Sequence, residues 1–170
     1  MDLNRYSRQI IFHEIGNIGQ EKLLDSKVAI VGMGALGSVI ANNLCRAGVG
    51  HIKLIDRDYV ELTNLQRQSI FDEDDADKQT PKAVAAYEHL LKINSEIKLE
   101  PIVIDVNSAN VEELLDGMDL VLDGTDNVEI RYLLNEVCLK KQIPWIYGGV
   151  LGAYGSTMNI IPDETPCFKC

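Results

Sequence analysis

The sequence has few aromatic residues and no excess of positive charge. Aromatic residues make up 6% of its 170 residues, and 16 Lys and Arg face 26 Asp and Glu, a formal net charge of −10. Nucleic-acid surfaces need clustered cations to neutralise phosphates, so this balance argues against a nucleic-acid partner. The rest of the composition, 46% hydrophobic and 25% charged, is typical of globular domains, and we expect one domain over residues 1–170.

Long apolar runs are also missing. No uncharged apolar stretch reaches the length of about 18 residues that a membrane-spanning helix requires. The first five residues, Met-Asp-Leu-Asn-Arg, carry no apolar signal region. We therefore expect no membrane partner and a cytoplasmic location.

Cysteine is scarce, and its four positions fall into two kinds. Cys45 and Cys138 lie in apolar, helix-like stretches, where free thiols are usually buried. Cys167 and Cys170 form a Cys-Phe-Lys-Cys motif at the end of the sequence. Structural zinc takes four protein ligands, and this pair supplies two of them. The half-motif predicts that the sequence is part of a longer chain.

From residue 27 onward, short apolar runs alternate with amphipathic segments, which is typical of parallel strands covered by helices. We predict an α/β fold: a Rossmann-like, mostly parallel sheet with helices on both faces and an N-terminal helical extension. The predicted strands lie at residues 28–31, 52–55, 99–106, 119–123, 145–147 and 156–161. The predicted helices lie at residues 3–12, 20–26, 35–47, 81–94, 109–115 and 128–141.

Local signals mark several boundaries. Gly48 is placed to end the helix at 35–47, Pro81 suits a first helical turn, and Ser108 suits an N-cap. The run at residues 72–80, Asp-Glu-Asp-Asp-Ala-Asp-Lys-Gln-Thr, carries mostly like charges, which repel one another. It predicts a solvated, mobile loop, or alternatively a lid over a neighbouring site.

A glycine-rich segment, Gly-Met-Gly-Ala-Leu-Gly at residues 32–37, follows the first predicted strand and opens a helix. In this context Gly32 allows a tight turn, Gly34 lets a phosphate approach the backbone, and Gly37 lets the helix pack on the strand. Free N–H groups and the helix dipole then favour an anion. The segment predicts a phosphate-binding turn.

Asp56 ends the second predicted strand, roughly 20 residues after Gly37, the spacing of an acid that accepts from a ribose hydroxyl. An aspartate that only caps a loop is the alternative. The combination predicts nucleotide binding, although an NAD-dependent dehydrogenase would show the same pattern.

Polar and cationic residues then follow, with Asn64, Arg67 and Gln68 in one segment and Lys82 on the next helix. An enzyme that handles a triphosphate needs such residues, because Arg and Lys clamp phosphoryl oxygens and neutralise developing charge. A dehydrogenase does not need them there. Ordinary surface cations are the alternative for Arg67 and Lys82.

The fourth predicted strand ends in Asp-Gly-Thr-Asp-Asn at residues 123–127. Ligands bind beyond the carboxyl ends of strands in such sheets, so Asp123 or Asp126 would face the phosphates. A carboxylate there suits Mg²⁺, which takes one or two carboxylates together with phosphate oxygens. An N-cap on the following helix is the alternative for Asp126.

Together these motifs resemble the ThiF/MoeB family, the adenylyltransferases that activate ubiquitin-like sulfur-carrier proteins for thiamine and molybdopterin synthesis. The matching segments keep the family's order. They are Arg-Tyr-Ser-Arg-Gln at 5–9, the glycine-rich turn, Asn-Leu-Gln-Arg-Gln at 64–68, Pro-Lys at 81–82, Asp-Gly-Thr-Asp-Asn at 123–127 and Cys-Phe-Lys-Cys at 167–170.

The resemblance implies roles for the nucleotide-binding residues. Asp56 would hold the ATP ribose, and Gln68 would lie near the nucleotide. Asn64, Arg67 and Lys82 would contact the phosphates. The further nucleotide-binding positions would be Gly32, Gly34, Ala35, Leu36, Gly37, Asp58, Asp126 and Asn127.

It also implies the chemistry and the partners. Arg8, Arg67, Lys82 and Asp126 would be catalytic, with Asp126 holding Mg²⁺ and Arg8 reaching the triphosphate of the second subunit of a homodimer. Cys167 and Cys170 would be half of a structural Zn²⁺ site. The protein partner would be a ubiquitin-like sulfur carrier, whose C-terminal glycine carboxylate attacks ATP.

Two other interpretations stay open. The resemblance places a second cysteine pair and part of the carrier groove after residue 170, so the chain could be a truncated ATP-binding or dimerisation module without activity. An NAD-dependent dehydrogenase is supported only by the turn and Asp56. The residues do not distinguish a thiamine carrier from a molybdopterin carrier.

Overall fold

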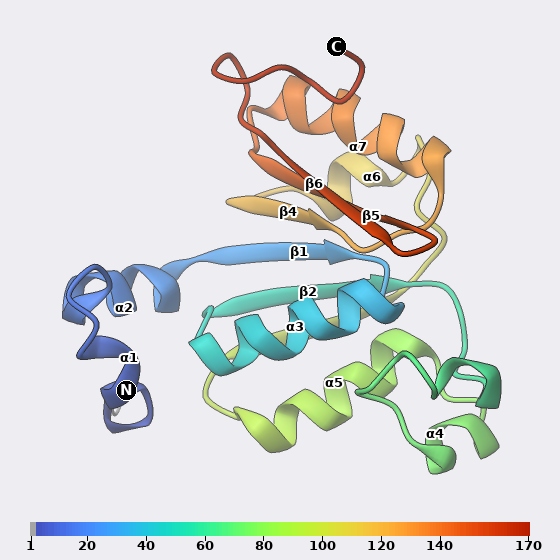
Figure 1. Ribbon diagram of the computed structural model, residues 1–170, viewed down its shortest axis with the longest axis horizontal. Helices are drawn as coiled ribbons and strands as arrows, with labels where there is room; N and C mark the ends of the chain where they lie inside the picture. The colour runs from blue at the N-terminus through green and yellow to red at the C-terminus, as the bar shows by residue number, and fades with distance from the viewer. Residues whose placement is uncertain (1–2) are drawn as a thin grey trace.

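Six strands form one sheet in the computed structural model, which describes residues 3–170 (Figure 1). They are β1 (Lys27–Val31), β2 (His51–Asp56), β3 (Lys98–Val103), β4 (Leu120–Asp123), β5 (Trp145–Leu151) and β6 (Tyr154–Ile160). Their order is β3-β2-β1-β4-β5-β6, and every pair is parallel except the β5–β6 hairpin. This is the doubly wound Rossmann order, so the predicted fold class is confirmed.

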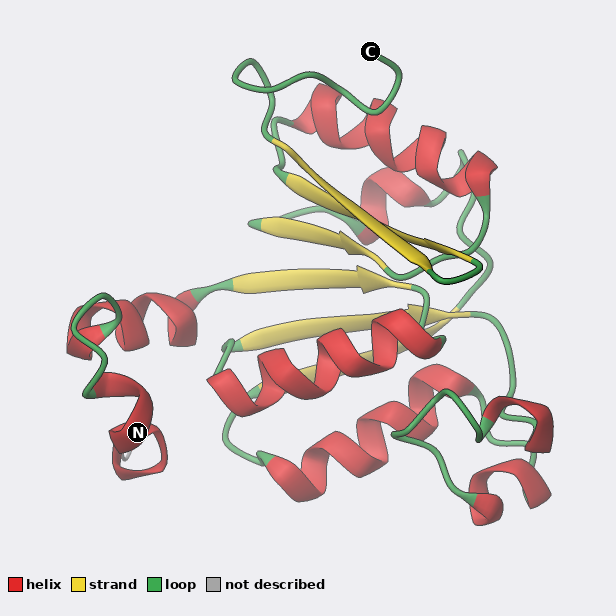
Figure 2. Ribbon diagram, in the orientation of Figure 1, coloured by secondary structure: helices red, strands yellow, loops and turns green. Residues whose placement is uncertain are grey.

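Helices cover both faces of the sheet, as Figure 2 shows. On one face α3 (Ala35–Ala47) and α5 (Lys82–Ile93) bury their small apolar side chains against the strands. On the other face lie α6 (Val111–Leu114) and α7 (Val128–Lys141). Gly48 ends α3 in the left-handed conformation with φ of +84°, as predicted.

The N-terminal extension consists of η1 (Leu3–Tyr6), α1 (Ser7–Ile10) and α2 (Gly16–Asp25). Buried Tyr6 anchors it, because the Asn94 side-chain amide donates to the Tyr6 hydroxyl at 2.9 Å. The Gln9 amide donates to the Ala47 carbonyl at 3.0 Å. The extension therefore docks at the end of the sheet where the parallel strands begin (Figure 1).

Several local predictions are wrong. The strand predicted at 99–106 ends at Val103, and Pro81 is the N-cap residue of α5 and not part of its first turn. Residues 72–80 hold a helix, α4 (Glu73–Asp77), because the carboxylates of Asp72 and Asp75 each accept the other's backbone N–H at 3.1 Å. His89 also lies 2.8 Å from Asp75. Asn110, not Ser108, holds the N-cap position of α6. Among the described residues, no helix has both the length and the apolar character needed to cross a membrane.

Candidate nucleotide-binding site

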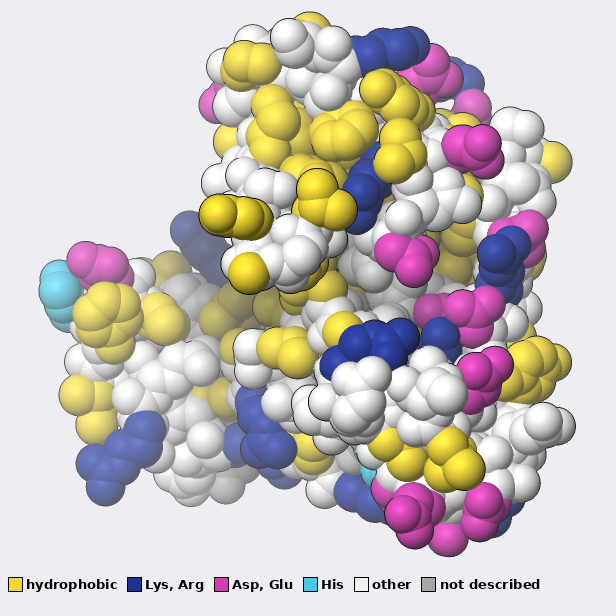
Figure 3. All heavy atoms as spheres, turned by 45° about the vertical axis from the view of Figure 1, so that its right-hand side comes forward, with side chains coloured by type: hydrophobic (Ala, Val, Ile, Leu, Met, Phe, Trp, Pro, Cys, Tyr) yellow, Lys and Arg dark blue, Asp and Glu magenta, His cyan; other side chains and the backbone are white. Residues whose placement is uncertain are grey.

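The predicted nucleotide-binding residues, without Arg8 and the Cys167–Cys170 pair, gather where the parallel strands end. Val31 of β1 lies level with Ile55 of β2 and with Asp123 of β4. The strand order reverses at β1, and open α/β sheets bind ligands at such a switch point. Figure 3 turns this edge toward the viewer and shows acidic and basic side chains side by side around a hollow.

Three glycine backbones pack against one another at this edge. Gly32 has a left-handed φ of +91°, and a Cβ on Gly37 would collide with the Gly32 carbonyl. A Cβ on Gly124 would lie 2.6 Å from the same carbonyl oxygen and 2.8 Å from the Gly37 Cα. The tight turn and the close helix contact expected of Gly32 and Gly37 are both present. Gly124 takes part in the same backbone contact, which sequence reasoning did not foresee.

α3 begins directly after this turn, at Ala35 and Leu36. Gly34 is the N-cap residue, and no side chain caps the helix. The first N–H groups of such a helix need a partner, and the helix dipole favours an anion. Among the described residues, a Cβ on Gly34 would approach only the Gln68 amide nitrogen, at 3.9 Å, so the space before the helix is open.

Asp56 connects the turn to the segment that follows β2. We call residues 56–68 together with Lys82 the β2 flank. The Asp56 carboxylate accepts the Met33 N–H at 2.6 Å and the Asp58 N–H at 2.7 Å. Burial raises the pKa of Asp56 above its ordinary value, against the effect of these donors and of Lys82. A carboxylate has about four acceptor positions, so Asp56 retains some for a hydroxyl donor.

Lys82 is the first residue of α5, and its side chain is largely buried. Its side chain is 9% exposed, and Nζ lies 3.2 Å from Oδ2 of Asp58. The backbone N–H of Lys82 donates to the Asp58 carbonyl at 2.8 Å. The structure thus brings Asp56, Asp58 and Lys82 together, as the sequence predicts.

The three polar residues of the Asn-Leu-Gln-Arg-Gln motif have different surroundings. Buried Asn64 closes the turn η2 (Leu62–Asn64), where its Oδ1 accepts a backbone N–H at 3.1 Å. Arg67 is exposed and donates to a backbone carbonyl at 2.9 Å. Gln68 is 3% exposed, and its Oε1 has no hydrogen-bond partner in the described part of the chain. Buried acceptors without a partner are rare because they cost stability.

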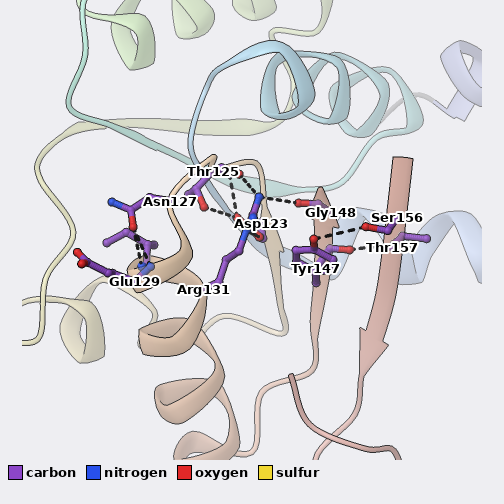
Figure 4. A network of polar contacts seen from close by, with 10 residues as sticks. Asp123, Thr125, Asn127, Glu129, Arg131, Tyr147, Gly148, Ser156 and Thr157 are labelled. Carbon is purple, nitrogen blue, oxygen red and sulfur yellow. Dashed lines mark hydrogen bonds and ion pairs between the residues drawn. The ribbon is translucent and has the colours of Figure 1, made fainter. Parts of the chain in front are cut away.

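A closed polar network occupies the other side of the turn, in residues 123–131, which we call the β4 flank (Figure 4). Asp123 accepts from Arg131 Nε at 3.0 Å and from the Thr125 N–H and hydroxyl at 2.8 and 2.7 Å. Burial raises the pKa of Asp123 above its ordinary value, against the effect of Thr125 and Arg131.

Arg131 also binds beyond its own loop. Nη2 donates to the carbonyls of Thr125 at 2.6 Å and Gly148 at 3.2 Å, and the guanidinium lies 5.0 Å from the centre of the Tyr147 ring. Sequence reasoning missed Arg131. Its place one turn into the helix after an acidic strand end is the signal that could have found it.

Asp126 is the free carboxylate of the β4 flank. It is exposed and has no hydrogen bond or ion pair with any described residue. The N-cap of α7 is Asn127, whose Oδ1 accepts the Glu129 N–H at 2.8 Å, so the alternative of Asp126 as the cap is wrong. Since Asp123 is engaged by Arg131, Asp126 is the acid of this motif that remains available to a ligand.

Arg8 lies apart from the other predicted residues. It is exposed on α1, at the end of the sheet opposite to the glycine-rich turn (Figure 1). Within one chain the structure does not bring Arg8 to the site.

The two kinds of cysteine also separate in the structure. Cys45 and Cys138 are buried as predicted, and burial raises the pKa of Cys138 to about 12. The sulfur atoms of Cys167 and Cys170 lie 2.9 Å apart, and the hydrogen bond from the Cys170 thiol lowers the pKa of Cys167. This second pair presents two convergent sulfur ligands.

A cavity with a volume of about 690 Å³ lies at the opposite end of the sheet, at the start of β1, β2 and β3. Charged groups there pair with one another: Glu100 lies 2.8 Å from His51 and 3.2 Å from Lys98. The groups suited to phosphate are at the carboxyl edge instead.

A Rossmann-like sheet with an uncapped helix after a glycine turn is typical of nucleotide-binding α/β domains. The sequence profile of the ThiF family matches residues 6–170, and the chain belongs to this family. The match confirms the resemblance that the motifs indicate.

Several known proteins are similar to this chain. It is 46% identical over 166 residues to the sulfur carrier protein ThiS adenylyltransferase of Bacillus subtilis (strain 168), covering 98% of this chain and 49% of that protein. It is 39% identical over 170 residues to the molybdopterin-synthase adenylyltransferase of Escherichia coli (strain K12), covering 99% of this chain and 68% of that one. The solved structure of E. coli MccB with ATP has a TM-score of 0.88 at 31% identity, covering 99% of this chain and 51% of its own. The chain thus spans about half the length of the Bacillus relative and of MccB.

Proposed function

We propose that this chain is the ATP-binding part of an enzyme that adenylylates the C-terminal glycine of a ubiquitin-like sulfur-carrier protein, of the ThiS or MoaD type. The observation that carries the proposal is the uncapped N-terminus of α3, which opens toward Gln68 at the end of the sheet where the β2 flank presents Lys82 and the β4 flank presents Asp126. Two similar proteins are named for adenylylation of such carriers or of their synthase. A dehydrogenase has no use for this set of charges.

ATP fits the donors and acceptors of the site. The α3 N-terminus and Lys82, with exposed Arg67, offer positive charge to a triphosphate. Asp56 keeps acceptor positions for ribose hydroxyls. The Gln68 amide approaches Gly34 through its nitrogen, and its Oε1 has no hydrogen-bond partner among residues 3–170. Every one of these groups lies on the β2 flank or on the turn itself.

Mg²⁺ fits Asp126. The cation takes few protein carboxylates and keeps waters and phosphate oxygens, so one exposed carboxylate beside a triphosphate suits it. It would neutralise charge on the phosphates in a site that contains Asp56, Asp58 and Asp123 as well.

The reaction needs no covalent group from the enzyme. A carboxylate oxygen of the carrier's C-terminal glycine attacks the α-phosphorus of ATP, and the bond from that phosphorus to the oxygen bridging to the β-phosphorus breaks. Pyrophosphate leaves with the electron pair of that bond, and an acyl-adenylate forms. Lys82 and Arg67 position the triphosphate and offset the negative charge that moves onto pyrophosphate.

Arg8 completes the site in a homodimer. It is exposed, lies at the far end of its own sheet, and shares the N-terminal extension with Ile11, Phe12 and Ile18, which are 71%, 51% and 70% exposed. Exposed apolar side chains grouped in this way are typical of a surface that a second subunit covers. In the dimer Arg8 would neutralise the triphosphate of the other subunit.

Cys167 and Cys170 are two ligands of a structural Zn²⁺ site. Their thiols converge, and the pKa of Cys167 is lowered toward the thiolate that zinc binds. Two further ligands would come from outside residues 3–170 or from a partner. Cytoplasmic reducing conditions, which keep such thiols free, agree with the proposal.

A carrier-dependent ATP–pyrophosphate exchange assay on the full-length protein tests the function. We expect exchange with ThiS- or MoaD-type carriers, and none with the same carriers lacking their C-terminal glycine. Exchange that does not depend on the carrier, or no exchange with any carrier of either type, would refute the assignment.

A further inference from the structure

Asp58 contacts Lys82 through both its main chain and its side chain. The Asp58 carbonyl accepts the Lys82 N–H at 2.8 Å, and its Oδ2 lies 3.2 Å from the Lys82 ammonium. The Asp58 N–H donates to Asp56, which also accepts the Met33 N–H. One residue therefore connects the lysine to the acid that holds the glycine-rich turn.

The exposures of the two charges differ sharply. The Lys82 side chain is 9% exposed, whereas the Asp58 side chain is 57% exposed. A charge on a largely buried side chain is costly unless an opposite charge lies against it. Asp58 supplies that charge, and its loop is held in place because the Val60 N–H donates to the Thr80 carbonyl at 2.9 Å.

We propose that Asp58 is a positioning residue for Lys82 and does not itself contact the nucleotide; this rests on the proposed function. In the free protein its carboxylate keeps the ammonium extended at the edge of the site. When a triphosphate arrives, the ammonium turns to the phosphates, while the backbone bond to Asp58 keeps the start of α5 in place. A carboxylate repels phosphate, so the assignment of Asp58 as a nucleotide contact is replaced by this indirect role.

Steady-state exchange on the full-length enzyme tests whether Asp58 acts through Lys82. D58N keeps the size of the side chain and removes its charge, and we expect kcat to fall about tenfold with KM for ATP changed less than about twofold. K82A combined with D58N should be no slower than K82A alone. The proposal would be overturned if the fold-losses in kcat of D58N and K82A multiplied in the double variant, or if D58N left kcat unchanged.

D105N is the matched control. Asp105 is an exposed aspartate that binds Arg57 at 2.9 Å, and Arg57 also lies 3.6 Å from Asp58, yet Asp105 has no contact with Lys82. We expect D105N to match the wild type. A loss in D105N equal to that in D58N would assign the effect to surface charge and overturn the positioning role.

A second measurement does not depend on activity. In the nucleotide-free protein, acylation by an amine-reactive ester, read by mass spectrometry, reports the accessibility of Lys82, with exposed Lys78 as the internal reference. D58N should speed acylation of Lys82 several-fold and leave Lys78 unchanged. Equal rates in both proteins would overturn the Asp58–Lys82 pair even if the wild type exchanges, whereas a wild type without exchange would refute the proposed function alone.

Discussion

The two flanks of the glycine-rich turn are both rich in charged residues, but they differ in how completely their polar groups are paired. In the β4 flank, Asp123 and Arg131 satisfy each other in a buried pair whose side chains are 0% and 12% exposed. In the β2 flank, the Gln68 acceptor has no partner among residues 3–170, and the ammonium of Lys82 pairs with an exposed carboxylate.

The difference shows how one site can have a rigid part and still offer polar groups to a ligand. The closed network of the β4 flank fixes a loop that presents a single free acid, Asp126. The β2 flank keeps donors and acceptors that a ligand can take over with little rearrangement. Unsatisfied or shared polar groups reduce stability, and functional sites are where such costs are found.

The largest effect on stability should come from removing Arg131 from the polar network of the β4 flank. R131M leaves the Asp123 carboxylate buried without its cation, and we expect the free energy of unfolding to fall by about 3–5 kcal/mol in urea titrations. Burial already raises the pKa of Asp123, so the variant should hold the proton to higher pH. Its deficit should therefore shrink as the pH falls and grow as it rises.

R57M is the matched control for that measurement. Arg57 pairs with Asp105 on the surface, where both side chains are more than half exposed, and such pairs contribute about 0–1 kcal/mol. Similar losses in R57M and R131M would show that the β4 network contributes no more than a surface pair.

The next largest difference should be between the stabilities of two glycine-to-alanine variants, one on each side of the glycine-rich turn. G124A places a Cβ against the backbone of Gly32 and Gly37, and we expect a loss of about 3 kcal/mol or more in thermal or urea unfolding. G34A faces the open space before Gln68, and its stability should change by less than about 1 kcal/mol. Equal destabilisation would contradict this backbone contact.

Substitutions of Asp126 and Asp56, two acids of the proposed ATP site, should affect different quantities: the exchange rate and the affinity for ATP. D126A should lower carrier-dependent exchange by about 100-fold or more. It should largely spare equilibrium binding of ATP and stability, because the carboxylate has no partner in the part of the chain that the structure describes. D56A should weaken ATP binding itself. Wild-type exchange in both variants would reject these roles.

The smallest effect should come from the unpartnered acceptor of the β2 flank. Q68L removes a buried carbonyl without a partner, so stability should stay the same or rise by up to about 1 kcal/mol. ATP affinity, measured by calorimetry, should fall several-fold. A clear loss of stability with unchanged affinity would make Gln68 a structural residue and remove the contrast between the flanks.

Most of the fold could be predicted because its signals are local. The apolar runs that became β1, β2 and β4 alternate with helices of regular period, and Gly32 and Gly37 specify the turn by their lack of a Cβ. The wrong predictions concern places where neighbours decide. Like charges at residues 72–80 suggested an open loop, but a capping box and His89 hold them in a helix.

The sequence by itself determined the doubly wound sheet, the glycine turn and the set of polar residues around it, since strand periodicity and motif spacing are written along the chain. Only the tertiary structure decided which of those polar groups are free. Asp123 and Asp126 are indistinguishable as letters, but Arg131 reaches one of them and leaves the other exposed. The reason is physical: the availability of a charge depends on burial and on the partner within about 3 Å, and both come from segments that meet only when the chain folds.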